Sequence, residues 1–235
     1  MIKKPQQPAT IYEKNSMGTK TVKEISNDVK NRVDDITDEF KEGLHFIEEY
    51  DKTVTIFGSA RTPETDKGYQ QARRLSYRIA KELDYAVITG GGPGMMEAGN
   101  RGACEAGGES LGLNIKLPFE QVLNEYTTRS KSFHYFFSRK MCMTFESQAF
   151  IYMPGGYGTL DELFEVLTLM QTKKMPKVPI FLVGKKFWKP LDNFIKKNLL
   201  KNATISPGDE KLYVITDDED LIVETIKNTP IRKED

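Results

Sequence analysis

The residues most suggestive of chemistry lie at positions 153–159, which read M-P-G-G-Y-G-T. They follow the apolar run A-F-I-Y, and the helical pattern L-D-E-L-F-E follows them. Because glycine has no Cβ, the backbone at Gly155, Gly156 and Gly158 can turn sharply and expose its N–H groups. The helix that begins near Thr159 would point its positive end the same way. This junction predicts an anion site that suits a phosphate, with a tight turn that binds nothing as the alternative.

Three acidic residues, Asp161, Glu162 and Glu165, occupy the first turns of the expected helix. Acidic side chains near a helix N-terminus complement the helix dipole, each by about 0.3 to 1 kcal/mol, so all three have an ordinary structural explanation. Asp161 and Glu165 are four residues apart and share a face, whereas Glu162 points about 100 degrees away. Spacing alone does not choose which carboxylate faces the anion site.

A second glycine-rich stretch, G-G-G-P-G-M-M-E at positions 90–97, follows an earlier strand. It departs from the dinucleotide fingerprint G-x-G-x-x-G, because Glu97 comes three residues after Gly94 and the loop follows the second strand, not the first. It also lacks the G-K-[ST] ending of the phosphate loop of nucleoside triphosphatases. NAD and ATP sites are therefore disfavoured, while a nucleotide site and a turn that only allows close helix packing both stay open.

Two adjacent cations, Arg139 and Lys140, lie in S-F-H-Y-F-F-S-R-K-M-C-M-T-F-E at positions 132–146. The apolar residues of this segment predict a helix with a core face, in which His134 is an ordinary helix residue. Neighbouring cations of this kind are typical of a solvated edge. The residues alone assign them no function.

Short β-branched or aromatic runs alternate with helical patterns through most of the chain, which predicts an α/β fold: a Rossmann-like, doubly wound parallel sheet with helices on both faces. Strands are expected at 53–57, 85–89, 110–115, 149–153, 178–183 and 212–216, and helices near 66–83, 94–107, 133–147, 159–173, 187–201 and 218–228. Such sheets bind ligands beyond the carboxyl ends of strands, where the strand order reverses. In the strand order 3-2-1-4-5-6, the glycine-rich segments after the first and fourth strands meet at that point. The glycine-rich segment after the second strand lies beside them.

The residues before the first strand differ from the rest in composition. Positions 1–20 are polar and lack periodic apolar residues, so we expect a flexible tail. Positions 21–50 carry apolar residues at spacings of three and four, which predicts an amphipathic helix that docks on the domain or on a second subunit. The Rossmann-like domain would then cover 51–235.

The overall composition points to a small-molecule partner in the cytoplasm. Lysine plus arginine and aspartate plus glutamate are equal at 34 each, so no net field attracts nucleic acid or an anionic membrane. The two cysteines are too few for a disulfide framework or a structural zinc site. We also expect no secretory signal and no membrane span, because no apolar run is long enough.

The combination of R-K at 139–140, P-G-G-Y-G-T-L-D-E at 154–162 and the G-G-G-P-G-M-M-E-A loop resembles the paired motifs of the LOG ("Lonely guy") family, long labelled lysine decarboxylases. The resemblance runs from about residue 53 to 225, and the N-terminal helix is similar to that of longer bacterial members. It implies a Rossmann-like, usually dimeric hydrolase that needs no cofactor or metal. Such enzymes cleave cytokinin riboside 5'-monophosphates or AMP to the free base and ribose 5-phosphate.

The resemblance also implies roles for particular residues. It makes Arg139 and Glu162 the catalytic pair and thereby chooses among the acids that spacing left open; whether Asp161 contributes stays undecided. The substrate-binding positions that it implies are Gly58, Ser59, Gly92, Met95, Glu97, Lys140, Gly155, Gly156, Gly158 and Thr159.

The resemblance is incomplete at the first loop, and it leaves a second function class open. The loop reads G-S-A-R at 58–61 where many plant members read G-S-S, so the base preferred, adenine or a prenylated adenine, is undecided. A non-catalytic nucleotide-binding or molybdenum cofactor carrier of the same fold is the alternative function. The paired arginine and glutamate favour the enzyme.

Overall fold

The computed structural model describes residues 22–117 and 122–232, so the expected tail at positions 1–20 lies outside the described residues. The chain divides into two compact units between Thr37 and Asp38. In the first unit, the described residues form the beginning of helix α1 (Val22–Ile47). The second unit contains the end of α1, the sheet and the remaining described helices.

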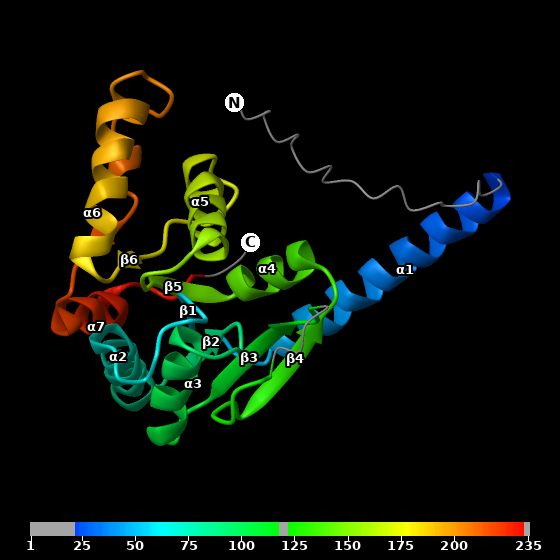
Figure 1. Ribbon diagram of the computed structural model, residues 1–235, viewed down its shortest axis with the longest axis horizontal. Coiled ribbons are helices and arrows are strands. Elements are labelled where there is room, and N and C mark those ends of the chain that lie inside the picture. Colours follow the sequence, from blue (N-terminus) through cyan, green and yellow to red (C-terminus); the bar gives the residue numbers. More distant parts are fainter. Residues whose placement is uncertain (1–21, 118–121, 233–235) are drawn as a thin grey trace, which may run out of the picture. The chain divides into compact units, whose positions relative to one another are not determined.

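Seven parallel strands form one sheet within the described residues, in the order β4-β3-β2-β1-β5-β6-β7 (Figure 1). Their bounds are β1 (Thr53–Phe57), β2 (Ala86–Thr89), β3 (Ser110–Ile115), β4 (Arg129–Phe133), β5 (Ser147–Tyr152), β6 (Ile180–Leu182) and β7 (Val214–Ile215). The chain winds outward from β1 in both directions, so the strand order reverses between β1 and β5. This confirms the predicted doubly wound sheet, with β5 in the place of the fourth expected strand.

Strand β4 has no counterpart among the strands expected from the sequence. Its residues, R-S-K-S-F, are mostly polar and contain no β-branched side chain, so the usual strand signal is missing. It lies at the sheet edge and pairs with β3 from Leu111↔Arg129 to Ile115↔Phe133. Consequently the next helix begins at Phe136, and His134 lies between strand and helix, which corrects its expected place within a helix.

Helices cover both faces of the sheet. One layer contains α2 (Lys67–Leu83), α3 (Met95–Glu105) and α7 (Glu219–Asn228), and the other contains α4 (Phe136–Phe145), α5 (Tyr157–Gln171) and α6 (Lys185–Phe194). The π-helical segment η1 (Ile195–Leu200) continues α6, and the 3-10 turn η2 (Asp209–Lys211) precedes β7. None of the helices in these described ranges combines the length and apolar composition that a bilayer span requires.

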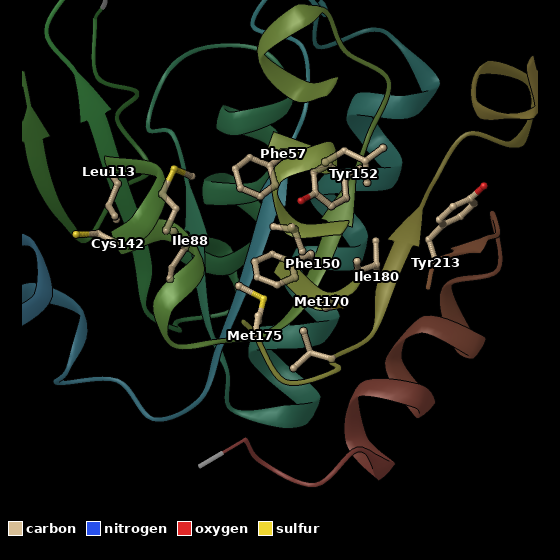
Figure 2. Close-up of a cluster of buried hydrophobic side chains, with 14 of the residues drawn as sticks. Phe57, Ile88, Leu113, Cys142, Phe150, Tyr152, Met170, Met175, Ile180 and Tyr213 are labelled. Atoms are coloured by element: carbon tan, nitrogen blue, oxygen red, sulfur yellow. The ribbon is translucent and has the colours of Figure 1, made fainter. Parts of the chain in front are cut away.

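Two hydrophobic cores lie on opposite faces of the sheet because alternate strand residues point to opposite sides. In β6, for example, Ile180 and Leu182 belong to the core beneath α4, α5 and α6, whereas Phe181 belongs to the core beneath α2, α3 and α7. Figure 2 shows the first of these cores, where Phe57, Phe150 and Tyr152 of the two central strands lie together. The rings of Phe57 and Tyr152 stack with centroids 5.0 Å apart. Strands β1 and β5, which flank the reversal, are therefore held firmly together.

Helices α2 and α3 approach each other closely at Gly102. A Cβ on this residue would overlap the backbone oxygen of Arg73 and would lie 2.8 Å from the backbone nitrogen of Tyr77. The Ser76 hydroxyl also donates a 2.5 Å hydrogen bond to the Gly99 carbonyl across the same contact. Backbone atoms cannot rotate away as a flexible side chain can, so this helix contact requires glycine.

We predict that Gly102→Ala lowers the free energy of unfolding by about 1 to 3 kcal/mol, because the added methyl group must force α2 and α3 apart. Gly158→Ala is the control: a Cβ there meets no atom within 4 Å, and alanine favours a helix by up to about 1 kcal/mol over glycine. Urea unfolding followed by circular dichroism measures both. Equal stability of the two variants would contradict the proposed close contact.

Candidate active site

A cleft of about 890 Å³ opens beyond the carboxyl ends of β1 and β5, where the strand order reverses. Its walls come mainly from the loop after β1, the loop after β5 and the start of α4. The lining residues that bear on the chemistry are Gly58, Ser59, Arg61, Met96, Phe136, Arg139, Gly155, Gly156, Gly158, Thr159, Glu162 and Phe187. The cleft therefore lies where the topology predicts a ligand site.

Backbone hydrogen bonds join the three glycine-rich loops. The N–H of Ser59 donates to the carbonyl of Pro154 at 3.1 Å, and the N–H of Met95 donates to the carbonyl of Ser59 at 2.9 Å. Gly94 makes this approach possible: its φ is +70°, and a Cβ on it would overlap the backbone oxygen of Ser59. The expected meeting of the loops is confirmed.

The three glycines after β5 have different surroundings. A Cβ on Gly155 would overlap the hydroxyl of Thr159, whereas a Cβ on Gly156 or Gly158 would meet no atom within 4 Å. None of the three has a positive φ, so their backbone conformation does not require glycine. Gly155 allows the turn to pack on Thr159, and the other two leave bare backbone facing open space.

The beginning of α5 adds free hydrogen-bond donors beside this bare backbone. Gly156 is the N-cap residue, and no side chain caps the helix. The first backbone N–H groups of a helix have no partner within it, and the helix dipole adds partial positive charge at the same end. The start of α5 at Tyr157 therefore provides an anion site on the wall of the cleft.

Arg139 projects from α4 into the cleft and is only 6% exposed. Its Nε donates a 2.7 Å hydrogen bond to the Leu113 carbonyl within β3, the one hydrogen bond of this side chain within the described residues. A Cβ on Gly90 would overlap Nη2 of the guanidinium, so the second glycine-rich loop leaves space for this cation. Burial lowers the pKa of Arg139, and the nearby charge of Glu162 opposes that shift.

Glu162 lies on the first turns of α5 and faces the same cleft. Burial raises its pKa to about 7, more than the charge of Arg139 lowers it. Its carboxyl group forms no hydrogen bond and no ion pair with any described residue, although its backbone carbonyl accepts a 3.1 Å bond from the Tyr152 hydroxyl. A half-buried carboxyl group that titrates near neutrality is suited to accept a proton from a bound reactant.

Lys140 lies apart from the cleft, although it follows Arg139 directly. Its ammonium group binds the carboxylates of Asp161 at 3.0 Å and Glu165 at 2.9 Å. Burial lowers the pKa of Lys140, but these two carboxylates outweigh that effect and leave it raised. Asp161 and Glu165 thus use the face of α5 that their spacing gives them, and Glu162 alone of the three lines the cleft.

Of the substrate-binding positions that the family resemblance implies in the first two loops, some line the cleft and others do not. Gly58 and Ser59 line the cleft. Gly92, Met95 and Glu97 do not: the Gly92 carbonyl accepts a hydrogen bond from Asn124 at 3.0 Å, Met95 is buried against Gly58, and Glu97 accepts a 2.7 Å bond from the Tyr69 hydroxyl. Within the described residues these three support the second loop and do not face the cleft.

Several residues of the cleft wall were not anticipated from the sequence. Phe136 comes three residues before Arg139, so helical spacing could have placed both on one face of α4. Met96 at the start of α3 and Phe187 at the start of α6 carry no comparable signal, because their part in the wall depends on how separate elements meet. In the described ranges no group of three or more histidine, cysteine, aspartate or glutamate side chains could hold a metal ion.

Comparison with known proteins identifies related sequences over most of the chain. Residues 96–226 match the family model described as "possible lysine decarboxylase". A cytokinin riboside 5'-monophosphate phosphoribohydrolase of Rhodococcoides fascians is 26% identical over 179 residues, which make up 75% of this chain and 90% of that protein. A probable enzyme of the same name from Oryza sativa subsp. japonica is 31% identical over 166 residues, or 69% of this chain and 66% of that protein.

A solved structure with a similar fold is the molybdenum cofactor carrier protein of Chlamydomonas reinhardtii. It has a TM-score of 0.56, covers 76% of this chain and is itself covered to 97%, but it is only 21% identical. At that identity the likeness concerns the fold alone.

We predict that Glu162→Gln changes how stability depends on pH. The pKa of Glu162 is raised from 4.5 to about 7 in the folded protein, so the folded state binds this proton more tightly than the unfolded state does. The resulting stabilisation of the folded state is complete at pH values below the pKa of the unfolded state. This contribution is lost as the pH rises through about 7. The wild-type melting temperature should therefore fall relative to that of Glu162→Gln between about pH 5 and 8. A constant difference between the two proteins in differential scanning fluorimetry would contradict the raised pKa.

Proposed function

Because this chain belongs to the LOG family, we propose that it hydrolyses the N-glycosidic bond of nucleoside 5'-monophosphates, either cytokinin riboside monophosphates or AMP. The products would be the free base and ribose 5-phosphate. One observation carries the proposal: Arg139 and Glu162 line one cleft, and in the described structure neither side chain neutralises the other in an ion pair.

The bare backbone of Gly156 and Gly158 supports binding of the 5'-phosphate. Both glycines leave open space beside the uncapped start of α5. A phosphate there would accept backbone N–H hydrogen bonds and meet the positive end of the helix. Glu162 lies on the same helix, so a phosphate at this end would bring the attached ribose toward its carboxyl group.

Glu162 is suited to activate the attacking water. Hydrolysis breaks the bond between C1' of the ribose and the base nitrogen, and it joins C1' to the oxygen of water. Positive charge develops on the sugar meanwhile, as in glycoside hydrolysis, and a nearby carboxylate stabilises that charge. The proton lost by water passes to the ionised carboxylate of Glu162, and the departing base takes up one proton from solvent. Glu162 then releases its proton to solvent, so the net reaction consumes one water and involves no oxidation or reduction.

Arg139 is suited to bind negative charge at the other side of the reacting bond. Its guanidinium is held at Nε by Leu113, and its two terminal NH₂ groups form no hydrogen bond with any described residue. Those groups can bind the phosphate or stabilise the charge that develops on the departing base. A planar guanidinium orients such groups better than the flexible ammonium of lysine.

We predict that the purified protein releases base from a nucleoside 5'-monophosphate and not from the matching nucleoside. Without the phosphate, the bare backbone at α5 has no anion to bind, and the sugar is no longer positioned. Chromatography of reactions with AMP, isopentenyladenosine monophosphate and their unphosphorylated forms measures release. Equal cleavage of the unphosphorylated forms would refute the phosphate site. Binding of every monophosphate without release would favour the non-catalytic alternative.

We predict that Glu162→Gln lowers turnover at least about 100-fold while nucleotide binding changes little, because the amide cannot accept the proton from water. Asp161→Asn is the matched control: it alters the adjacent carboxylate, which binds Lys140 outside the cleft. That variant should keep most of its turnover. Initial rates and isothermal titration with AMP test both variants. If instead Asp161→Asn were inactive and Glu162→Gln active, the carboxylate role would belong to Asp161.

A further inference from the structure

The end of helix α1 contacts the segment that runs from β4 into α4. Two glutamates of this helix and one just after it make the polar contacts: Glu42 binds Lys131 of β4, Glu49 binds Arg129 of β4, and Glu39 binds the start of α4. All of these residues belong to the unit that begins at Asp38. Of these three polar contacts, that of Glu39 alone reaches the helix that carries Arg139.

The carboxylate of Glu39 takes the place of a capping residue for α4. Tyr135 is the N-cap residue of that helix, but its side chain forms no capping hydrogen bond. Instead Glu39 accepts the backbone N–H of His134 at 2.5 Å and that of Tyr135 at 3.1 Å, and it also accepts the hydroxyl of Ser138. Its negative charge meets the positive end of α4, which stabilises this first turn.

The ionisation of Glu39 agrees with this role. Burial raises its pKa, but the hydrogen bonds from Ser138 and from the two backbone N–H groups outweigh burial and leave the pKa lowered. The carboxylate therefore stays charged at neutral pH.

Apolar contacts hold Glu39 at this end of α4. A Cβ on Gly43 would lie 2.6 Å from the sulfur of Cys142 and 2.8 Å from the ring of Phe133, so this glycine lets α1 approach both α4 and β4. One turn earlier, the rings of Phe40 and Phe137 pack with centroids 5.9 Å apart. The two helices are thus packed together just beyond the carboxylate, along the turns that follow Glu39 in α1.

Arg139 lies in the first turn of α4, which Glu39 caps. The backbone N–H of Arg139 donates to the carbonyl of Tyr135 at 3.2 Å, so this residue closes the first turn of α4. The guanidinium itself has one hydrogen bond within the described residues, to Leu113. Its place in the cleft therefore depends on the place of the backbone that carries it.

We propose that Glu39 is a positioning residue for Arg139: by capping α4 it holds the guanidinium of Arg139 at the cleft. The proposal rests on the proposed function for the part that concerns turnover. The geometric part, from Glu39 to the hydrogen bond between Arg139 and Leu113, does not.

The geometric part is tested by the ¹⁵N–¹H resonance of the Arg139 Nε–H, assigned by its loss in Arg139→Lys. In Glu39→Ala we expect this resonance to move toward the position of a solvent-exposed arginine. Glu39→Gln should give a smaller shift, because its amide oxygen can still accept one of the backbone bonds. The control Glu42→Gln removes a neighbouring contact to β4 only and should leave the resonance in place. An unmoved resonance in both Glu39 variants would overturn the proposal.

The functional part is tested by turnover of AMP in the same proteins. Misplacement of a positioned group by about 1 Å can cost about 100-fold, so Glu39→Ala should lose activity on that scale and Glu42→Gln should not. The Arg139→Lys background separates positioning from general damage, because there the loss caused by Glu39→Ala should largely disappear. An equal loss in both backgrounds would overturn the positioning role. If the resonance moved in the Glu39 variants but the wild-type protein cleaved no nucleotide, the proposed function would be contradicted and the geometric part would stand.

Discussion

A buried guanidinium and a half-buried carboxyl group face the same cleft, and the described structure keeps them from pairing directly. Arg139 comes from α4, before β5, and Glu162 comes from α5, after it, and no ion pair joins their side chains within the described residues. Had they formed an ion pair, the pKa of Glu162 would be held low and the cation would be satisfied. Their separation leaves a raised carboxyl pKa on one side and unused donors on the other. A substrate that places an anion and a reacting sugar between them can use both.

The charged residues next to Arg139 and Glu162 pair with one another outside the cleft. Lys140, next to Arg139, binds Asp161 and Glu165, the two acids that flank Glu162. This pairing takes one cation and two carboxylates out of the cleft. Gly90 leaves space for the guanidinium, and the glycines after β5 leave bare backbone at the start of α5. Arg139 and Glu162 thus differ from Lys140, Asp161 and Glu165 in what they contact and not in the kind of charge they carry.

How much of the fold and the site could be predicted from the sequence depended on how far apart in the chain the interacting residues lie. The order of the strands follows from alternating patterns, and the meeting of the glycine loops follows from that order. The separation of Glu162 from Asp161 by helical spacing was also visible, but choosing between them required the family resemblance. Strand β4 was missed because an edge strand needs few apolar residues. Met96, at the start of α3, enters the cleft wall through the meeting of elements distant in sequence, which spacing does not encode.

The contact between Glu39 and α4 could not be predicted from local sequence patterns. Glu39 and Tyr135 are 96 residues apart, and a glutamate on a helix that is otherwise rich in acids carries no distinguishing mark in the sequence. Helix α1 also lies outside the residues that match the family model, which begin at position 96. Yet a helix terminus needs partners for its first N–H groups, and Tyr135 does not supply them with its side chain. That requirement connects the N-terminal helix to the start of α4, and through one turn of backbone to Arg139.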